Sequence, residues 1–173
     1  MMNETLKSFF NAFHYDAHPM AMLVGVMGSL SAFYHDSLDI LDPRHREMLA
    51  TFTSQDLCVL CGVIEVDDRA QISKTYGIIR GDDDSIYRLI EKPPNPMNDT
   101  MGTGNCVFSR RIFDYIERTP INQQRGEKEL PDLVQCAIDD GQPVKAFFIG
   151  SRYVNVNTPD EIGRAEEALR RDA

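Results

Sequence analysis

Apolar runs without a polar face alternate along the chain with segments of helical periodicity. The runs at residues 20–27 and 57–66 are apolar on both faces, which predicts buried strands of the kind found in parallel sheets. Apolar residues at helical spacing predict a helix over about residues 4–17, and Asp42-Pro43 has the residue types that begin another helix. Residues 28–41 are polar and aromatic, which predicts a loop.

The second half repeats this alternation with shorter strands. The predicted strands are 76–79, 86–90, 102–108, 144–149 and 153–155, and the predicted helices begin at Ser109, Leu130 and Thr158. Strands that alternate with helices predict an α/β protein with a mixed, mostly parallel sheet and helices on both sides. No repeat and no low-complexity linker interrupts the sequence, so residues 1–173 are predicted to form one domain.

Charge and hydropathy exclude some classes of partner. The chain has 27 acidic and 18 basic residues and a net charge of −9, which argues against a nucleic-acid surface because such surfaces need a basic stripe. No apolar run approaches the ~20 residues that cross a bilayer, so no membrane partner is expected. The N-terminus lacks the basic start and apolar stretch of a signal peptide, which predicts a cytoplasmic location.

Two of the four cysteines have the spacing of a redox or zinc motif. Cys58 and Cys61 are separated by two residues, but both lie in the predicted strand 57–66. Residues three apart on a strand point to opposite faces, so the two thiols are not expected to share a metal ion. We therefore predict that both are buried core residues without a metal.

Residues that suit a sugar phosphate lie at the ends of several predicted strands. In open α/β sheets the ligand sits beside such ends. Gly77 opens a strand, Glu91-Lys92 ends one, and Asn155 ends another, while residues 126–132 precede a helix N-terminus that attracts anions. Each also has a plainer interpretation, as an exposed ion pair, a solvated face or a turn.

The order and spacing of these motifs resemble a known family. The segments are Tyr76-Gly-Ile-Ile79, Leu89-Ile-Glu-Lys-Pro93, Gly102-Thr-Gly-Asn-Cys-Val-Phe108, Gly126-Glu-Lys-Glu-Leu-Pro-Asp132 and Val154-Asn-Val-Asn-Thr-Pro159. Together they are similar to the second half of sugar-1-phosphate nucleotidyltransferases, over about residues 57–170. The resemblance implies a three-layer α/β/α Rossmann-like nucleotidyltransferase fold.

The resemblance also implies a reaction and roles for particular residues. The family transfers a nucleotidyl group from an NTP to a sugar 1-phosphate, which gives an NDP-sugar and pyrophosphate with the help of Mg²⁺. By position, Glu91 and Glu129 would bind sugar hydroxyls and Lys92 the sugar phosphate. The backbone at Gly77 and Gly104 would contact the sugar. Asn155 falls where the family has an Asp or Asn ligand of Mg²⁺.

Three departures from the family's pattern change this picture. The glycine-rich loop that cradles the triphosphate is not found in the sequence, so the chain is expected to be a partial domain without its N-terminal strands. The strand at 20–27 is followed by Gly28-Ser29 where the family has Gly-Asp, so one Mg²⁺ ligand is expected to be lost. Gly102 stands where the family often has Asn.

These departures leave three hypotheses. The chain binds an NTP and acts only when a complementary half is supplied, and is inactive when isolated. Alternatively, it is a non-catalytic homologue that binds a sugar phosphate or an intact enzyme and regulates it, or it is a purely structural remnant. A sheet that lacks its first strands has an open edge, which a second copy or a partner chain could cover.

Overall fold

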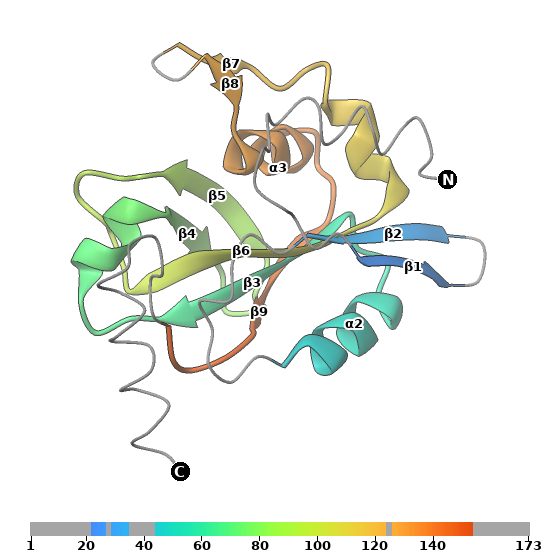
Figure 1. Cartoon of the computed structure of the whole chain (residues 1–173), viewed down its shortest axis with the longest axis horizontal. Helices are drawn as coiled ribbons and strands as arrows, with labels where there is room; N and C mark the ends of the chain where they lie inside the picture. The colour runs from blue at the N-terminus through green and yellow to red at the C-terminus, as the bar shows by residue number, and fades with distance from the viewer. Residues whose placement is uncertain (1–21, 27–28, 35–43, 124–125, 154–173) are drawn as a thin grey trace.

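The computed structural model describes residues 22–26, 29–34, 44–123 and 126–153 (Figure 1). The strands are β1 (Met22–Val26), β2 (Ser29–Tyr34), β3 (Val59–Glu65), β4 (Tyr76–Arg80), β5 (Ile86–Glu91), β6 (Thr100–Phe108), β7 (Ile121–Asn122), β8 (Glu127–Lys128) and β9 (Val144–Phe148). The helices are α2 (His45–Thr53) and α3 (Leu130–Asp139), with the 3₁₀ turns η1 (Arg69–Lys74) and η2 (Arg110–Tyr115). No helix in these ranges is long and apolar enough to cross a membrane.

A seven-stranded mixed sheet with β6 at its centre organises the fold. One edge of β6 pairs with β3, and the other pairs with β2 and with β4. The mixed sheet is confirmed, but the expectation that most strands run parallel is wrong for the described strands, where β3 and β9 form the parallel pair. The reason is the short connections, such as residues 81–85 between β4 and β5, which can join only antiparallel neighbours.

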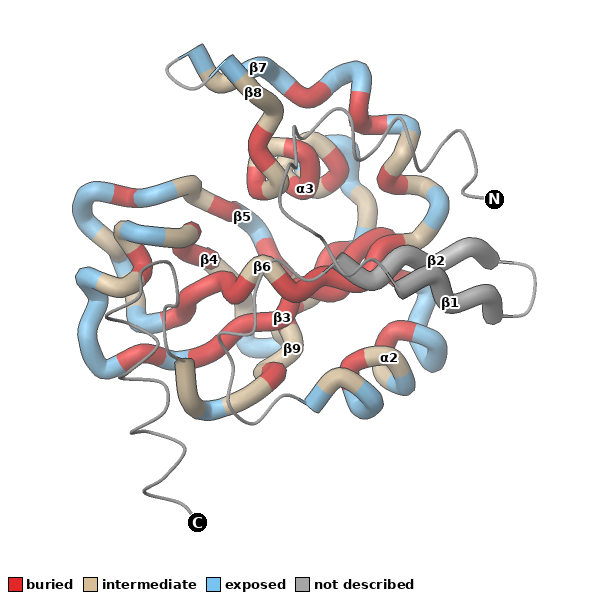
Figure 2. The backbone as a smooth tube through the Cα atoms, viewed as in Figure 1, coloured by how far each residue is buried: buried red, intermediate tan, exposed pale blue. Residues whose placement is uncertain are grey.

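The sheet has an apolar core on each face, as β3 illustrates (Figure 2). Val59, Cys61 and Val63 belong to the cluster that contains residues of α3 and η2. Leu60 and Ile64 belong to the cluster that contains residues of α2. Because side chains alternate along a strand, this strand is buried on both faces, as its sequence predicts.

Helices cover both faces, which confirms the α/β architecture. The cluster on one face contains Leu133, Val134 and Ala137 of α3, and the cluster on the other contains Met48 and Phe52 of α2. Figure 1 shows α3 and α2 on opposite sides of the strands. Gly141 lies just beyond the end of α3 with a φ of 77°, the left-handed conformation that glycine often adopts after a helix.

Two local expectations differ from the structure. Residues 29–34 form β2 rather than a loop, because a two-residue connection lets them pair with β1 in an antiparallel hairpin. The segment after Ser109 is the 3₁₀ turn η2 rather than a full helix. The helices predicted at 4–17 and from Thr158 lie outside the described residues.

The predicted burial of Cys58 and Cys61 is confirmed, but the expectation that strand geometry turns the two side chains to opposite faces is wrong. Both thiols are 0% exposed and lie in the same apolar cluster. Cys58 lies just before β3 rather than on it, and its N–H donates to the carbonyl of Pro143 at 2.8 Å. The alternation of side chains along a strand therefore does not separate these two residues, and the absence of a metal stays a prediction.

Thiol reactivity gives a direct test of this packing. In the folded chain we expect one thiol in four, that of Cys136, to react with the disulfide reagent DTNB. Cys136 is only partly buried, whereas Cys58, Cys61 and Cys106 are at most 1% exposed. Burial raises the pKa of both the Cys58 and the Cys136 thiol, so the difference in reactivity comes from exposure. The Cys136→Ser variant should lose the reaction until denaturant is added. Two or more equivalents of fast thiol without denaturant would contradict the prediction.

Candidate functional site

The candidate site forms where β4, β5 and β6 meet. Tyr76, the first residue of β4, lies opposite Glu91 of β5 on one side and opposite Gly102 of β6 on the other. Side chains of directly paired residues point to the same face of a sheet. The register therefore places the Glu91 carboxylate beside the Tyr76 ring on one face.

That face is the one covered by α3. Tyr76 and Leu89, which lies two residues before Glu91, both belong to the cluster packed against α3. Gln135 of α3 accepts a hydrogen bond at 2.9 Å from the backbone N–H of Leu89, so the helix lies directly against β5. Figure 1 shows β5 ending and α3 beginning on the same side of the molecule.

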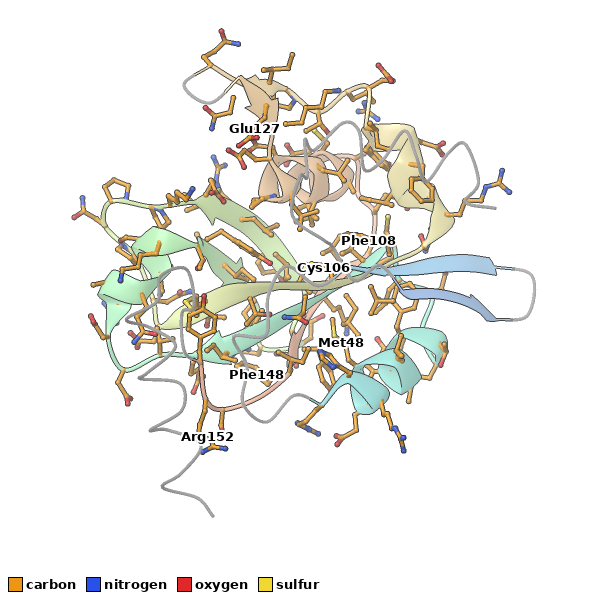
Figure 3. All side chains as sticks on the ribbon, viewed as in Figure 1. Met48, Cys106, Phe108, Glu127, Phe148 and Arg152 are labelled. Atoms are coloured by element: carbon orange, nitrogen blue, oxygen red, sulfur yellow. The ribbon has the colours of Figure 1, made fainter. Side chains whose placement is uncertain are left out.

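Glu129 marks the beginning of α3. It is the residue immediately before the helix and is 8% exposed. Figure 3 shows the neighbouring Glu127 beside the start of α3, whereas Met48 lies on the opposite side of the sheet. Glu129 therefore lies at the N-terminal end of the helix that packs against β5, the strand that ends at Glu91. Lys128 is held by the carbonyl of Ile116.

Glu91 and Lys92 form an ion pair at the end of β5. The distance from Lys92 Nζ to Glu91 Oε1 is 3.4 Å, and the side chains are 46% and 19% exposed, respectively. Lys92 has a φ of 42°, which is unusual for a residue with a side chain. Its N–H donates to the carbonyl of Thr75 at 2.7 Å, and this bond fixes the turn that presents the ammonium group.

Gly104 lies where the partner strand of β6 changes. On one edge, β6 pairs with β4 at Met101 and Gly102, and with β2 from Cys106 onward. Gly104 falls between these two pairings and has a φ of 75°. Its N–H donates to the Tyr76 hydroxyl at 3.3 Å. The backbone here departs from the regular strand conformation, as backbone that contacts a ligand often does.

A polar group lies under the other face of the same strand. Asn105 is 0% exposed, and its amide contacts His45 Nε2 at 3.1 Å and Thr103 Oγ1 at 3.2 Å. Thr103 Oγ1 in turn donates to the carbonyl of Gly62 at 2.9 Å. These bonds satisfy a fully buried amide and tie α2 to β6, so we assign them a structural role.

The structure brings together Gly77, Glu91, Lys92 and Gly104 around Tyr76, and it places Glu129 immediately before the helix that packs against β5. A Cβ added at Gly77 would meet Ile72 Cγ2 at 3.3 Å, so neighbouring side chains fill the space beside this glycine. Tyr76 is a further residue of this site, and its place in the sequence alone assigns it no role. The signal for it is an aromatic residue followed downstream by two closely spaced glycines.

The predicted magnesium site stays a prediction. Asn155, to which the resemblance assigns the metal, lies outside the described residues. Within the described part of the chain, no group of three or more His, Cys, Asp and Glu side chains could hold a metal ion. Carboxylate and amide oxygens are the ligands that Mg²⁺ prefers, and a serine hydroxyl in place of a carboxylate binds it more weakly.

Comparison with known proteins defines the class of protein that carries this site. Residues 32–170 match the family described as Nucleotidyl transferase, and the chain belongs to that family.

Three solved structures share the fold. One is described as a glucose-1-phosphate thymidylyltransferase of Bacillus anthracis in complex with sucrose (23% identity, TM-score 0.59, 74% of this chain and 49% of that chain covered). Another is apo UDP-glucose pyrophosphorylase (16% identity, TM-score 0.61, 89% of this chain and 52% of that chain covered). The third is UDP-glucose pyrophosphorylase in complex with UDP-glucose (15% identity, TM-score 0.63, 74% of this chain and 49% of that chain covered). The chain spans about half the length of these proteins.

Proposed function

We propose that this chain binds a sugar 1-phosphate on the α3 face of its sheet, as part of a nucleotidyl transfer reaction. The observation that carries the proposal is the register of β4 and β5, in which the carboxylate of Glu91 lies beside Tyr76 on the face covered by α3. The adjacent Lys92 supplies a half-exposed ammonium group. A carboxylate for hydroxyls next to a cation for a phosphate is the chemistry that a sugar phosphate requires.

In this proposal each residue has a separate task. Glu91 and Glu129 accept hydrogen bonds from sugar hydroxyls, and their low exposure makes those bonds stronger than in water. Lys92 binds the phosphate, and the backbone at Gly77 and Gly104 contacts the sugar. Such contacts orient the phosphate oxygen for in-line attack on the α-phosphorus of an NTP. Mg²⁺, held in part by Asn155, would offset the negative charge that develops in the transfer.

A second candidate function is binding without catalysis. Ser29 stands where the family has the metal-binding Asp, which favours a chain that holds the sugar phosphate but transfers no nucleotide by itself. Such a chain would act with a complementary half or would regulate an intact enzyme. Pyrophosphate release from an NTP and glucose 1-phosphate separates the candidates, since we expect none from the chain alone.

Calorimetric titration of the whole chain with α-D-glucose 1-phosphate, with and without Mg²⁺, tests the binding site. We expect the Lys92→Gly variant to bind at least tenfold more weakly, because it loses a charge-assisted contact with the phosphate. The free energy of unfolding of the same variant should be about 0.5–1 kcal/mol higher than that of the wild type, because glycine adopts a φ of 42° without strain.

Lys145→Ala is the matched control, since it removes a lysine on β9 that contacts the carbonyl of Asp83. Its affinity for glucose 1-phosphate should equal that of the wild type. An unchanged affinity in Lys92→Gly would refute the role of Lys92, and opposite changes in affinity and stability rule out simple unfolding as the cause of weaker binding.

A further inference from the structure

The Tyr76 ring lies directly on the backbone of Gly102. A Cβ built on Gly102 would stand 1.9 Å from Tyr76 Cε2 and 2.2 Å from Cζ, distances that no pair of carbon atoms tolerates without a bond. The ring is almost fully enclosed, since Tyr76 is 6% exposed. Gly102 thus makes the space for this ring at the position where the family often has Asn.

The Tyr76 hydroxyl reaches past Gly102 to the irregular part of β6. It accepts a hydrogen bond from the backbone N–H of Gly104 at 3.3 Å. Burial raises the pKa of Tyr76 well above its usual range, so the hydroxyl stays protonated. It can therefore donate one hydrogen bond and accept another at the same time.

We propose that Tyr76 is a positioning residue for the sugar, because its hydroxyl fixes the Gly104 backbone in the conformation that contacts the ligand. This inference rests on the proposed function. Gly102 and Gly104 are separated by one residue, and glycine restricts its own backbone least of all residues. Gly104 also lies between the β4 and β2 pairings of β6, so the ladder on that edge is interrupted there.

The hydroxyl has a purpose beyond filling space. A phenylalanine ring would cover Gly102 equally well, and burying a hydroxyl is unfavourable unless it is hydrogen-bonded. Glu91 of β5 pairs directly with Tyr76 of β4, and Tyr76 also pairs with Gly102 of β6. One tyrosine therefore lies between the carboxylate of β5 and the backbone of β6 that are proposed to bind the sugar. A change in the backbone conformation of Gly104 would therefore weaken binding of the sugar.

The Tyr76→Phe variant of the whole chain tests this inference, because it keeps the ring and removes the hydroxyl. NMR hydrogen exchange would measure protection of the Gly104 amide, and calorimetry would measure affinity for α-D-glucose 1-phosphate. We expect at least fivefold faster exchange at Gly104 and about five- to tenfold weaker binding, the effect of one lost hydrogen bond.

Tyr115→Phe is the matched control. Tyr115 is 4% exposed and its hydroxyl donates to Asp140 at 2.9 Å, so the variant loses a comparable bond away from the site. It should change neither Gly104 exchange nor affinity. Unchanged exchange in Tyr76→Phe overturns the inference, and so does faster exchange with unchanged affinity. If the wild-type chain binds no glucose 1-phosphate, the proposed function fails, and exchange at Gly104 alone then decides whether Tyr76 holds that backbone.

Discussion

Substitution of Gly102 by alanine is expected to lower the free energy of unfolding by about 3 kcal/mol, at the upper end of overpacking costs. The added methyl group would stand 1.9 Å from Tyr76 Cε2. The ring cannot swing into solvent at low cost, because Tyr76 is 6% exposed and lies in the cluster packed against α3. Urea unfolding of the variant, followed by circular dichroism, measures the loss.

Gly77→Ala is the control, because its added Cβ meets Ile72 Cγ2 at 3.3 Å, a contact that a small shift relieves. We expect a cost below about 1 kcal/mol for it. Combining Gly102→Ala with Tyr76→Val should cost about 2 kcal/mol less than the sum of the single variants, since the clash is between those two residues. Additive costs, or a tolerated Gly102→Ala, would mean that the ring does not lie on this backbone.

The strands could be predicted because a buried strand consists of consecutive or alternating apolar residues. The run at 57–66 is apolar at consecutive positions, and β3 (Val59–Glu65) is indeed buried on both faces. The same reasoning located β4, β5, β6 and β9 to within a few residues. Helix α3 was recognisable from its apolar spacing, from Pro131 in its first turn and from Gly141 beyond its end.

Strand direction could not be predicted in the same way. An apolar run shows that both faces are covered, but the direction of a neighbouring strand depends on hydrogen bonds and connections. The five residues between β4 and β5 were the available signal, since a connection that short permits only a hairpin. The strand β2 could not be predicted, because the polar and aromatic residues at 28–41 are typical of a loop.

The sequence allowed some residues of the candidate site to be predicted, but not all of them. Glu91, Lys92 and Glu129 could be proposed from motif order, because each lies at the end or the beginning of a recognisable element. Tyr76 could not, because its role depends on contact with Gly102, 26 residues away, across a strand pair whose register no periodicity reveals. The departure at Gly102 was visible in the sequence, but its meaning required the structure.

Stability at alkaline pH is expected to report on the same cluster. The hydrogen bond to Cys106, together with burial, raises the pKa of Cys61 well above its usual range, and burial does the same for the pKa of Tyr76. In unfolded chains, cysteine and tyrosine lose their protons near pH ~8.5 and ~10. Above those values the unfolded state binds fewer protons than the folded state, so stability is full below pH ~8.5 and falls as the pH rises.

For each group, the free energy of unfolding falls by about 1.4 kcal/mol per pH unit above the pKa of the unfolded chain, until the pH reaches the pKa of the folded state. The free energy of unfolding should therefore fall steadily between pH 8 and pH 11, first through Cys61 and, above pH ~10, through Tyr76 as well. Tyr76→Phe should make the fall above pH ~10 shallower, whereas Tyr87→Phe, which removes a phenol that is 60% exposed, should leave it as steep as in the wild type. Urea unfolding at pH 8, 9, 10 and 11 measures the profile. A level profile across this range would mean that the cluster is open to water and that Tyr76 is not held between Gly102 and Gly104.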